Sequence, residues 1–500
     1  MILRSRAVAV VAVVALAGSA CSASRPISRV TSKRGPKATP AVVIETAAPT
    51  EVGAIIGPGA ERPTGAAEGA AATAARKASA ARVVAKPGEK PTVTIDPATG
   101  IPVANLFNAQ EDTVGISSSE IKLCMHAAFA LGDLFNNKKE DEDVYWRMIN
   151  AEQNGVFGRR VKVQFEDDAY SPDVAIRAAD SCKANGNALM MSGVGFDQIP
   201  RVREWAETNR QLYFHSMATE DGAQNKNFSF AMAPTLQTVG RQIAQFIATR
   251  HPGKKVAVIS RNSPNWDGSL VGFNAEMARR GIKVEATHKT NNGDDYNVVI
   301  DDLKVKCPAS QCVLFSNENV INFAKMYQQA ENAPHNYRPR WFNYGFQLTN
   351  DTIGESTASA PAVQTWWPTP AFDLNNTTGQ PWFGEIQAMK AAYDKHCKSP
   401  CDKSSSELND VDWMFWLGWK SLHKLLTDCG KDCTRNKIAG ILLNGYRPRV
   451  DPLCEADFSR GTRHFGGHKT NIYEAVRGGR TPTGQPGALW KQIETCQEGF

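Results

Sequence analysis

Acidic residues and histidines are the side chains of this sequence that could carry out general acid–base chemistry. Paired carboxylates occur at Glu166-Asp167-Asp168, Asp294-Asp295 and Asp301-Asp302. Neighbouring residues of a strand point to opposite faces, so these pairs are more typical of solvated strand ends and helix faces than of a catalytic dyad. His126 and His215 follow strand-like runs and could line a crevice. A hydrolase that uses either histidine therefore stays open as a minor alternative.

The motifs that usually carry enzyme chemistry are missing from the sequence. It contains no G-x-S-x-G, no G-x-x-x-x-G-K-S/T, no H-E-x-x-H and no G-x-G-x-x-G, and Gly193-Val194-Gly195 lacks a third glycine. We therefore expect no catalytic residue, no cofactor and no metal. A metal site made by Cys454, His464 and His468 is an alternative, but the glycines around them favour a loop and the cysteines of exported proteins usually oxidise.

Polar and aromatic residues gather directly after the strand-like runs. The carboxyl ends of parallel strands line the ligand crevice of open α/β sheets, so these tails predict a binding site. Ser192-Gly193 could bring backbone N–H groups to an anionic ligand, or could be a plain turn. Trp266, Tyr344, Trp366 and Trp367 could stack on a ligand or fill the core. The tails are His126–Phe129, Asp168–Tyr170, Ser192–Gly195, Ser216–Thr219, Arg261–Trp266, Ser316–Glu318 and Tyr344–Phe346.

The elements that must position these tails are short β-branched runs that alternate with amphipathic windows. This alternation predicts βαβ units, parallel sheets and the α/β class, and the set repeats on either side of Pro234, which predicts two similar lobes. The expected strands are 121–124, 161–165, 188–192, 211–215, 255–260, 283–287, 312–315 and 340–343. The expected helices are 142–154, 173–185, 199–209, 235–250, 269–280, 298–306 and 320–331. A strand at 362–367 and helices at 382–396 and 410–427 follow, before a Gly- and Pro-rich segment, 445–500.

The cysteines point to an oxidising compartment. Of the 11 cysteines, Cys21 belongs to the leader, which leaves an even number for disulfides. The close pairs are expected to form disulfides between residues near in sequence, whereas the pairing of Cys124, Cys182, Cys454 and Cys496 stays open. The close pairs are Cys307/Cys312, Cys397/Cys401 and Cys429/Cys433.

The first 110 residues predict an export signal followed by a tether. Arg4 and Arg6 precede an apolar run, 7–17, and a small-residue cleavage zone. Residues 16–21, Leu-Ala-Gly-Ser-Ala-Cys, resemble a bacterial lipobox, with Gly18 where the family usually has Leu. The resemblance implies lipidation of Cys21, and ordinary signal-peptidase cleavage is an alternative. Residues 22–110 are poor in large apolar side chains and are expected to be disordered. Residues 1–110 carry a net charge of +7 and the whole chain +6, so residues 111–500 carry −1. This charge argues against nucleic-acid binding by the body.

Three stretches resemble the branched-chain amino-acid-type (Leu/Ile/Val-binding) periplasmic solute-binding proteins. They are TVGISSSEIKL at 113–123, INAEQNGVFGRRVKV at 149–163 and EDDAYSP at 166–172. The resemblance covers roughly residues 113–445 and is vaguer from 446 onward. It implies two Rossmann-like lobes joined by three crossovers, in an exported protein that is often lipid-anchored in Gram-positive bacteria.

The resemblance also implies lobe boundaries. The first lobe would comprise residues 113–233 and 366–444, and the second lobe residues 234–365 and 445–500. The crossovers would lie near Ala233-Pro234, Trp366–Pro370 and Gly445-Tyr446.

The family's ligand contacts, carried over by position, predict the site. The loop 191–196 and the strand end 216–219 would hold the ligand's carboxylate, and tails of the second lobe would close over it. Gly193-Val194-Gly195-Phe196-Asp197 departs from the family's usual Gly-Pro and paired hydroxyls, which argues against an α-carboxylate clamp. The aromatic residues suggest a ligand with an apolar or flat part. The predicted ligand-binding residues are Phe129, Tyr170, Ser192, Gly193, Phe196, Ser216, Ala218, Thr219, Trp266, Ser316, Asn317 and Tyr344.

The function that this resemblance implies is capture of a small solute, such as an amino acid, amide or small organic acid. The protein would hand the solute to the membrane permease of an ABC importer and act as a lipid-anchored, extracytoplasmic monomer. A ligand-sensing envelope receptor that signals to a partner protein is the main alternative. A purely structural wall lipoprotein is a further one.

Overall fold

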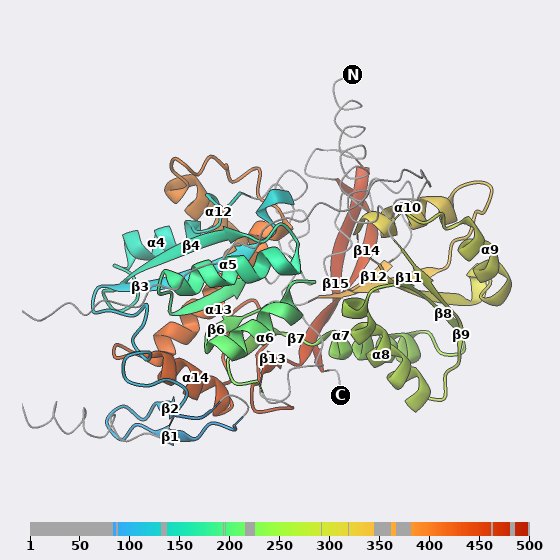
Figure 1. Ribbon diagram of the computed structural model, residues 1–500. Coiled ribbons are helices and arrows are strands. Elements are labelled where there is room, and N and C mark those ends of the chain that lie inside the picture. The colour runs from blue at the N-terminus through green and yellow to red at the C-terminus, as the bar shows by residue number, and fades with distance from the viewer. Residues whose placement is uncertain are drawn as a thin grey trace, which may run out of the picture. The chain divides into compact units, whose positions relative to one another are not determined.

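The computed structural model describes most of the chain beyond residue 83 (Figure 1). The described residues are 84–86, 89–131, 138–193, 195, 197–215, 226–291, 293–318, 320–344, 362–366, 382–461, 464–480 and 486–498. They fall within one compact unit, Arg82–Phe500. The predicted signal peptide, the lipidation site Cys21 and most of the predicted tether lie outside the described residues.

The first sheet has six strands in the order β13-β7-β6-β5-β3-β4, and all of its pairings are parallel. Its strands are β3 (Glu120–Ala127), β4 (Arg160–Asp167), β5 (Leu189–Ser192), β6 (Leu212–Phe214), β7 (Ser229–Pro234) and β13 (Phe465–Gly467). The helices that pack with it are α4 (Val144–Glu152), α5 (Pro172–Ala184), α6 (Ile199–Asn209), α12 (Phe383–His396), α13 (Asp410–Cys429) and α14 (Arg435–Leu443), with the 3-10 turn η1 (Phe129–Leu131) after β3. We call this sheet and its helices the first lobe.

The second sheet has seven strands in the order β15-β14-β12-β11-β10-β8-β9. Its first five strands along the chain pair in parallel, and the hairpin β14–β15 adds two antiparallel strands at one edge. The strands are β8 (Lys255–Arg261), β9 (Val284–Thr290), β10 (Cys312–Asn317), β11 (Arg340–Tyr344), β12 (Ala362–Trp366), β14 (Lys469–Arg480) and β15 (Pro486–Glu498). With α7 (Leu236–Arg250), α8 (Pro264–Arg279), α9 (Asn297–Lys306), η2 (Ala309–Gln311) and α10 (Val320–Glu331), they form the second lobe.

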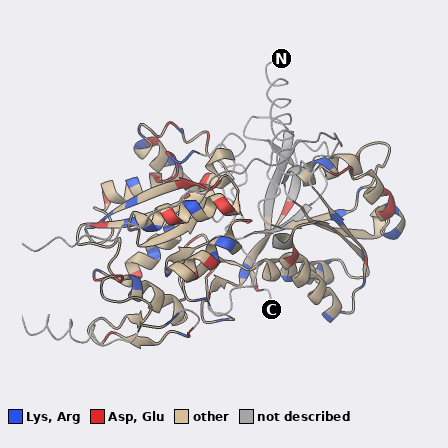
Figure 2. Ribbon diagram, in the orientation of Figure 1, with Lys and Arg blue, Asp and Glu red and all other residues tan. Residues whose placement is uncertain are grey.

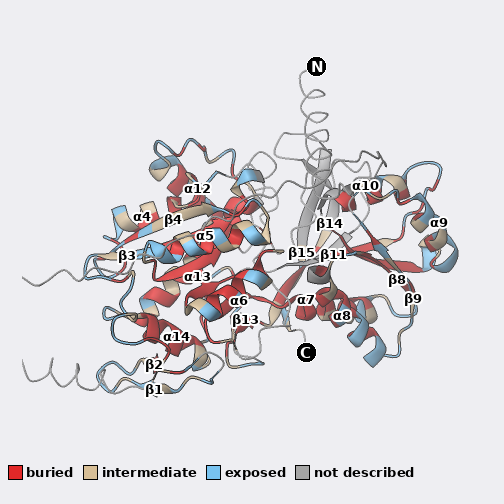
Figure 3. Ribbon diagram, in the orientation of Figure 1, coloured by how far each residue is buried: buried red, intermediate tan, exposed pale blue. Residues whose placement is uncertain are grey.

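Period-two alternation explains how helices cover both faces of the first sheet. Leu123 and Met125 of β3 lie in one apolar cluster with Trp146 of α4, whereas Cys124 between them lies in another with Ala179 of α5. The second sheet repeats the arrangement, with Phe315 stacked on Phe273 of α8 and Trp341 against Tyr327 of α10. Figure 3 shows the central strands as buried and the helices with exposed outer faces. The predicted α/β class with two parallel-sheet lobes is therefore confirmed.

Local signals at the helix ends agree with the sequence. Thr235 accepts a hydrogen bond from the Thr238 N–H at the start of α7, and Asn409 with Asp412 forms a capping box at the start of α13. Helices α5, α6 and α8 each carry a proline in the first turn, where the missing N–H costs nothing.

The chain passes between the lobes three times, and one crossover differs from the prediction. β7 leads directly into α7 at Pro234, and the second crossover falls between β12 and α12. β13 pairs with β7 of the first sheet and β14 belongs to the second, so the third crossover is at Gly467–Lys469. The predicted crossover at Gly445-Tyr446 is wrong because Phe465–Gly467, too short and glycine-rich to be recognised as a strand, returns to the first sheet.

The folded body begins before the predicted boundary at residue 110. A two-stranded antiparallel sheet, β1 (Val93–Ile95) and β2 (Pro102–Ala104), packs against α14, and Leu106 and Phe107 are buried. The disordered tether predicted for 22–110 is wrong for this part. Its apolar residues are few, but Val103, Ala104, Leu106 and Phe107 are buried against the first lobe.

The described residues hold five disulfides. The three close pairs predicted from the sequence are confirmed, and the other two are Cys124–Cys182 and Cys454–Cys496. The alternative metal site at Cys454 is wrong, because this thiol is oxidised and His464 Nδ1 lies 2.8 Å from the Ser229 carbonyl oxygen. None of the helices in the described part of the chain is both long and apolar enough to span a membrane.

Candidate functional site

The carboxyl ends of the parallel strands bring the predicted tails together within each lobe. In the first lobe β3, β4, β5 and β6 run side by side in parallel, so the residues that follow them lie along one edge of the sheet. In the second lobe the ends of β8, β9, β10 and β11 lie along one edge in the same way.

A buried hydrogen-bonded network connects four strand ends of the first lobe. His126 Nδ1 lies 2.8 Å from Asp168 Oδ2, and its Nε2 lies 3.0 Å from the Tyr213 hydroxyl. Gln198 Nε2 donates to Asp168 Oδ1 at 2.9 Å, and Ser192 is hydrogen-bonded to Tyr213. All five residues are at most 9% exposed. Every member therefore has a partner inside the lobe, as buried polar groups require.

The contacts of the network engage both ring nitrogens of His126. Nδ1 faces the Asp168 carboxylate, and Nε2 faces the Tyr213 hydroxyl. Burial raises the pKa of Tyr213 above its usual range, so this hydroxyl stays protonated and can donate. Both ring nitrogens of His126 are thus engaged by the protein, which fits a positioning role better than proton transfer to a substrate.

The turn after β5 is shaped by two glycines. A Cβ on Gly193 would lie 2.6 Å from both Ala127 Cβ and Phe415 Cε1, and one on Gly195, at φ +136°, would lie 2.4 Å from Gln198 Nε2. The turn therefore accepts only glycine at these positions without a shift of its neighbours. The Gly193 N–H, which the sequence suggested for a ligand, instead donates to the His126 carbonyl at 2.7 Å.

Phe129 and Tyr170 present aromatic surface at the same edge. Both are partly exposed, and the Phe129 ring meets Phe165 edge to face at 5.8 Å. Ala169 and Tyr170 have left-handed backbones, with φ of 49° and 56°. Non-glycine residues adopt this conformation at a cost, and such strain is concentrated at functional sites.

Asn317 in the second lobe joins strand ends to a helix. Its side chain donates to Ser260 Oγ at 2.9 Å and to the Trp266 carbonyl at 2.8 Å, and accepts from Ser269 Oγ at 2.6 Å. Trp266 is 3% exposed and lies in the apolar core, at the start of α8. In this arrangement both residues hold α8 against the sheet, and contact of either with a ligand stays a prediction.

Ser316 and Asn343 are register partners at the ends of β10 and β11. Both are fully buried, and neither the Ser316 hydroxyl nor the Asn343 amide has a hydrogen-bond partner among the described residues. Nearby Glu318 accepts from the Thr290 hydroxyl and from Asn322 Nδ2, the latter at 3.1 Å. The sequence analysis predicted Ser316 as a ligand contact but missed Asn343. Its position near the end of an apolar strand is a signal that could have identified it.

Other predicted ligand contacts lie outside the described residues: Phe196, Ser216, Ala218 and Thr219, together with the side chain of Tyr344. Two members of the first-lobe network, Tyr213 and Gln198, were missed. Tyr213 stands within an apolar strand, and a buried hydroxyl there signals a hydrogen-bond partner.

Figure 2 shows basic and acidic residues interspersed in both lobes.

Comparison with known proteins gives a consistent result. The family model described as periplasmic binding protein matches residues 142–480. Among curated proteins, none matches the sequence.

Solved structures share the fold at low identity. A fatty acid ABC transporter substrate-binding protein from Thermomonospora curvata is 16% identical, with a TM-score of 0.59 over 77% of this chain and 94% of that one. A solute-binding protein of an ABC transporter from R. palustris, in complex with 4-hydroxybenzoate, is 13% identical, with a TM-score of 0.59 over 76% and 98%. A branched-chain amino acid ABC transporter protein from Thermus thermophilus, with bound valine, is 12% identical, with a TM-score of 0.58 over 76% and 97%.

Proposed function

The chain belongs to the periplasmic binding protein family, and from this premise we propose that it is the extracytoplasmic solute-binding protein of an ABC importer. The observation that carries the proposal is the family match over residues 142–480, which spans most of both lobes. The predicted family is thereby confirmed. Transport, the identity of the solute and lipid anchoring at Cys21 belong to the proposal.

The proposed ligand is a small organic acid, amide or amino acid with an apolar or flat part. The structural neighbours are named for a fatty acid, 4-hydroxybenzoate and valine, each a carboxylic acid with an apolar portion. Phe129 and Tyr170 offer partly exposed aromatic surface at the first-lobe edge, and such surface suits an apolar or flat group.

The proposed mechanism is hinge closure about the three crossovers. The ligand would rest first on the loops after β3, β4 and β5, whose positions are fixed by the network of His126, Asp168 and Gln198. Contacts with the second lobe would then favour a closed form, and the ligand can shift this equilibrium only by its preference for that form. A permease would recognise the closed form and receive the solute. No catalytic role is proposed, because both nitrogens of His126 are engaged within the lobe.

Thermal denaturation of residues 22–500 with a library of amino acids, amides, fatty acids, aromatic acids and sugars tests the proposal. A compound that binds the folded state raises the midpoint by mass action, and we expect one chemical class, carboxylic acids or amides, to do so. Failure of every compound to shift the midpoint, or a shift that comes with chemical turnover of the compound, would contradict it.

Two glycine variants locate the site. In Gly193→Ala the new Cβ collides with Ala127 and Phe415, so the turn after β5 must move, and the ligand-induced shift should be lost. Gly384→Ala is the matched control, because its Cβ would enter open space on α12, and it should keep the full shift. Equal shifts in the two variants would place the ligand elsewhere.

A further inference from the structure

The third crossover is very short. β13 ends at Gly467 beside β7 of the first sheet, and β14 begins at Lys469 in the second sheet, so a single residue, His468, separates strands of the two lobes. A strand of one lobe is thus linked to a strand of the other with almost no intervening chain.

The segment that precedes this crossover is fixed to the first lobe. The Tyr446 hydroxyl donates to Asp428 of α13 at 2.6 Å, and Lys420 of α13 donates to the Asp451 carbonyl at 2.6 Å. The Phe458 N–H donates to the Tyr446 carbonyl at 2.9 Å, so the segment is also closed on itself. Cys454, 3% exposed, lies within it and therefore belongs to the first lobe.

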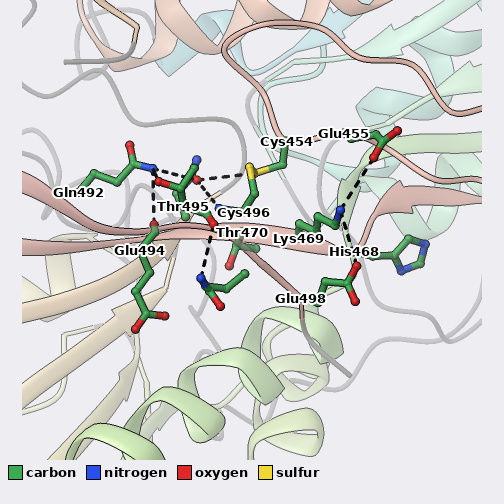
Figure 4. Close-up of a disulfide and its surroundings, with 12 residues drawn as sticks. Cys454, Glu455, His468, Lys469, Thr470, Gln492, Glu494, Thr495, Cys496 and Glu498 are labelled. Atoms are coloured by element: carbon green, nitrogen blue, oxygen red, sulfur yellow. Dashed lines mark hydrogen bonds and ion pairs between the residues drawn. A yellow bond between two sulfur atoms is a disulfide. The ribbon is translucent and has the colours of Figure 1, made fainter.

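Cys496 belongs to the second lobe and sits in a β-bulge of β15. Thr470 pairs with Gln497 and Ile472 with Glu494, so two residues of β15, Thr495 and Cys496, face Asn471 alone. Asn471 Oδ1 accepts from the Cys496 N–H at 2.9 Å, and Gln492 Nε2 donates to the same oxygen at 3.1 Å (Figure 4).

The backbone of Cys496 is left-handed, with φ of 47°. This conformation is unfavourable for a residue with a Cβ, and a bulge commonly serves to re-aim a side chain. The Asn471 amide holds the bulge in place, and Figure 4 shows the Cys496 side chain directed at Cys454. The bulge thus orients the Cys496 side chain toward Cys454 of the first lobe.

We propose that the Cys454–Cys496 disulfide is an interlobe pin that fixes the rotation axis of the lobes at the third crossover. The two Cα atoms are 5.4 Å apart, and a disulfide rarely spans more than about 6.8 Å between them. Points far from a rotation axis move by many ångströms when lobes open or close, so lobes joined at this bond can rotate only about an axis that passes close to it. This inference holds whatever solute the protein binds.

The other bonds of this region do not replace the pin. Lys469 Nζ lies 3.9 Å from Glu455 and 3.6 Å from Glu498, and an Arg460 nitrogen lies 3.3 Å from Glu498. Such exposed pairs contribute little and are screened by salt. Among the described disulfides, the other four each join elements of a single lobe.

Hydrogen exchange of residues 22–500, without added ligand, tests the pin. In Cys454→Ser/Cys496→Ser we expect the amides of 468–471 and 494–497 to exchange about tenfold faster, because this end of the sheet becomes free to open locally. Cys124→Ser/Cys182→Ser is the matched control: it removes a loop of similar size, 58 against 42 residues, that lies within the first lobe. Any global loss of stability is shared by both variants, so equal exchange at 468–471 and 494–497 would overturn the proposal.

A second measurement needs no variant and covers the case in which the serine pair does not fold. In the wild-type chain the amides around Cys496 and Lys469 should exchange about tenfold more slowly than the hydrogen-bonded amides beside the first crossover, Thr238 and Val239, which no disulfide spans. Similar rates at the two crossovers would refute the pin. Loss of ligand-induced stabilisation in the thermal screen would leave this inference untouched, which separates its failure from that of the proposed function.

Discussion

Glu142, two residues before α4, shows what burial does to a single carboxylate. It is 2% exposed, and neither of its oxygens has a hydrogen-bond partner in the part of the chain that the structure describes. Asp412 lies nearby and is paired with Lys403 at 2.6 Å. Burial, and after it the Asp412 charge, raises the pKa of Glu142 well above its usual range, and burial raises the pKa of Asp412 to about 6.

The sign of the pH dependence follows from these directions. Between the unfolded pKa values, about 4, and the raised folded ones, the folded chain binds more protons than the unfolded chain. The free energy of unfolding therefore falls as the pH rises through this window. The contribution of Glu142 and Asp412 to the free energy of unfolding is fully present at pH values below this window, where both acids are protonated in the folded and unfolded chains.

Glu142→Gln should stabilise the protein at neutral pH. An amide avoids the buried charge, so we expect the free energy of unfolding at pH 7.5 to rise by about 1–3 kcal/mol, and the gain to vanish near pH 4, where the wild-type carboxyl is protonated. Urea denaturation at the two pH values measures both. Glu140→Gln, at a partly exposed neighbour, should be neutral, and a loss of stability in Glu142→Gln at pH 7.5 would contradict the explanation.

At the scale of elements, the sequence predicted the parts of the fold with strong periodicity. The eight strands expected between residues 121 and 343 all exist. The central strands, such as β5, β8 and β10, are buried on both faces and leave a continuous apolar signal in the sequence. β13 was missed because Phe-Gly-Gly is a strand only by virtue of its pairing with β7. β14 and β15 were missed because the Gly- and Pro-rich segment that contains them reads as turns.

The candidate site was predictable to a lesser degree. Strand ends could be placed, since the carboxyl edge follows from parallel order, and Ser192 and Gly193 do lie at that edge. The hydrogen-bond partners at this edge could not be predicted. The contact of His126 with Tyr213, 87 residues away, depends on how the strands are ordered in the sheet. Trp266 illustrates the limit: an aromatic residue near a strand end can equally face the core, and this one does.

The β1–β2 segment gives an element-scale prediction through Asn436 of α14. This buried amide accepts from the N–H groups of Leu106 and Phe107, each at 2.9 Å, and donates to the Phe107 carbonyl at 2.8 Å. Asn436→Ala leaves these backbone groups unpaired, and we expect it to lower the free energy of unfolding by about 2–3 kcal/mol.

Two measurements check the role of Asn436. Urea denaturation gives the loss of stability, and proteolysis should cut the 93–107 segment faster in the variant. Asn444→Ala, at the exposed end of the same helix, is the control and should change neither. If Asn436→Ala were as stable as the wild type, the segment would not be docked through this amide.

At the scale of the whole molecule, the disulfides differ in how much chain they close. Cys124–Cys182 closes 58 residues and Cys307–Cys312 only 5. Chain entropy grows with the logarithm of loop length, so replacing the first pair by alanine should cost about 2 kcal/mol more than replacing the second. Urea denaturation of the two double variants tests this, and equal costs would mean that the unfolded chain is not constrained as the model of loop closure assumes.

The interleaved order of the strands has a consequence for biosynthesis. The first sheet draws its strands from residues 120 to 467 and the second from 255 to 498. A ribosome delivers the N-terminus first, so neither sheet can be completed until nearly all of the chain has emerged, and pairings over such separations form slowly. The strands that complete the two sheets, β13 in the first and β14 and β15 in the second, emerge last, so each sheet keeps an unpaired edge through most of synthesis.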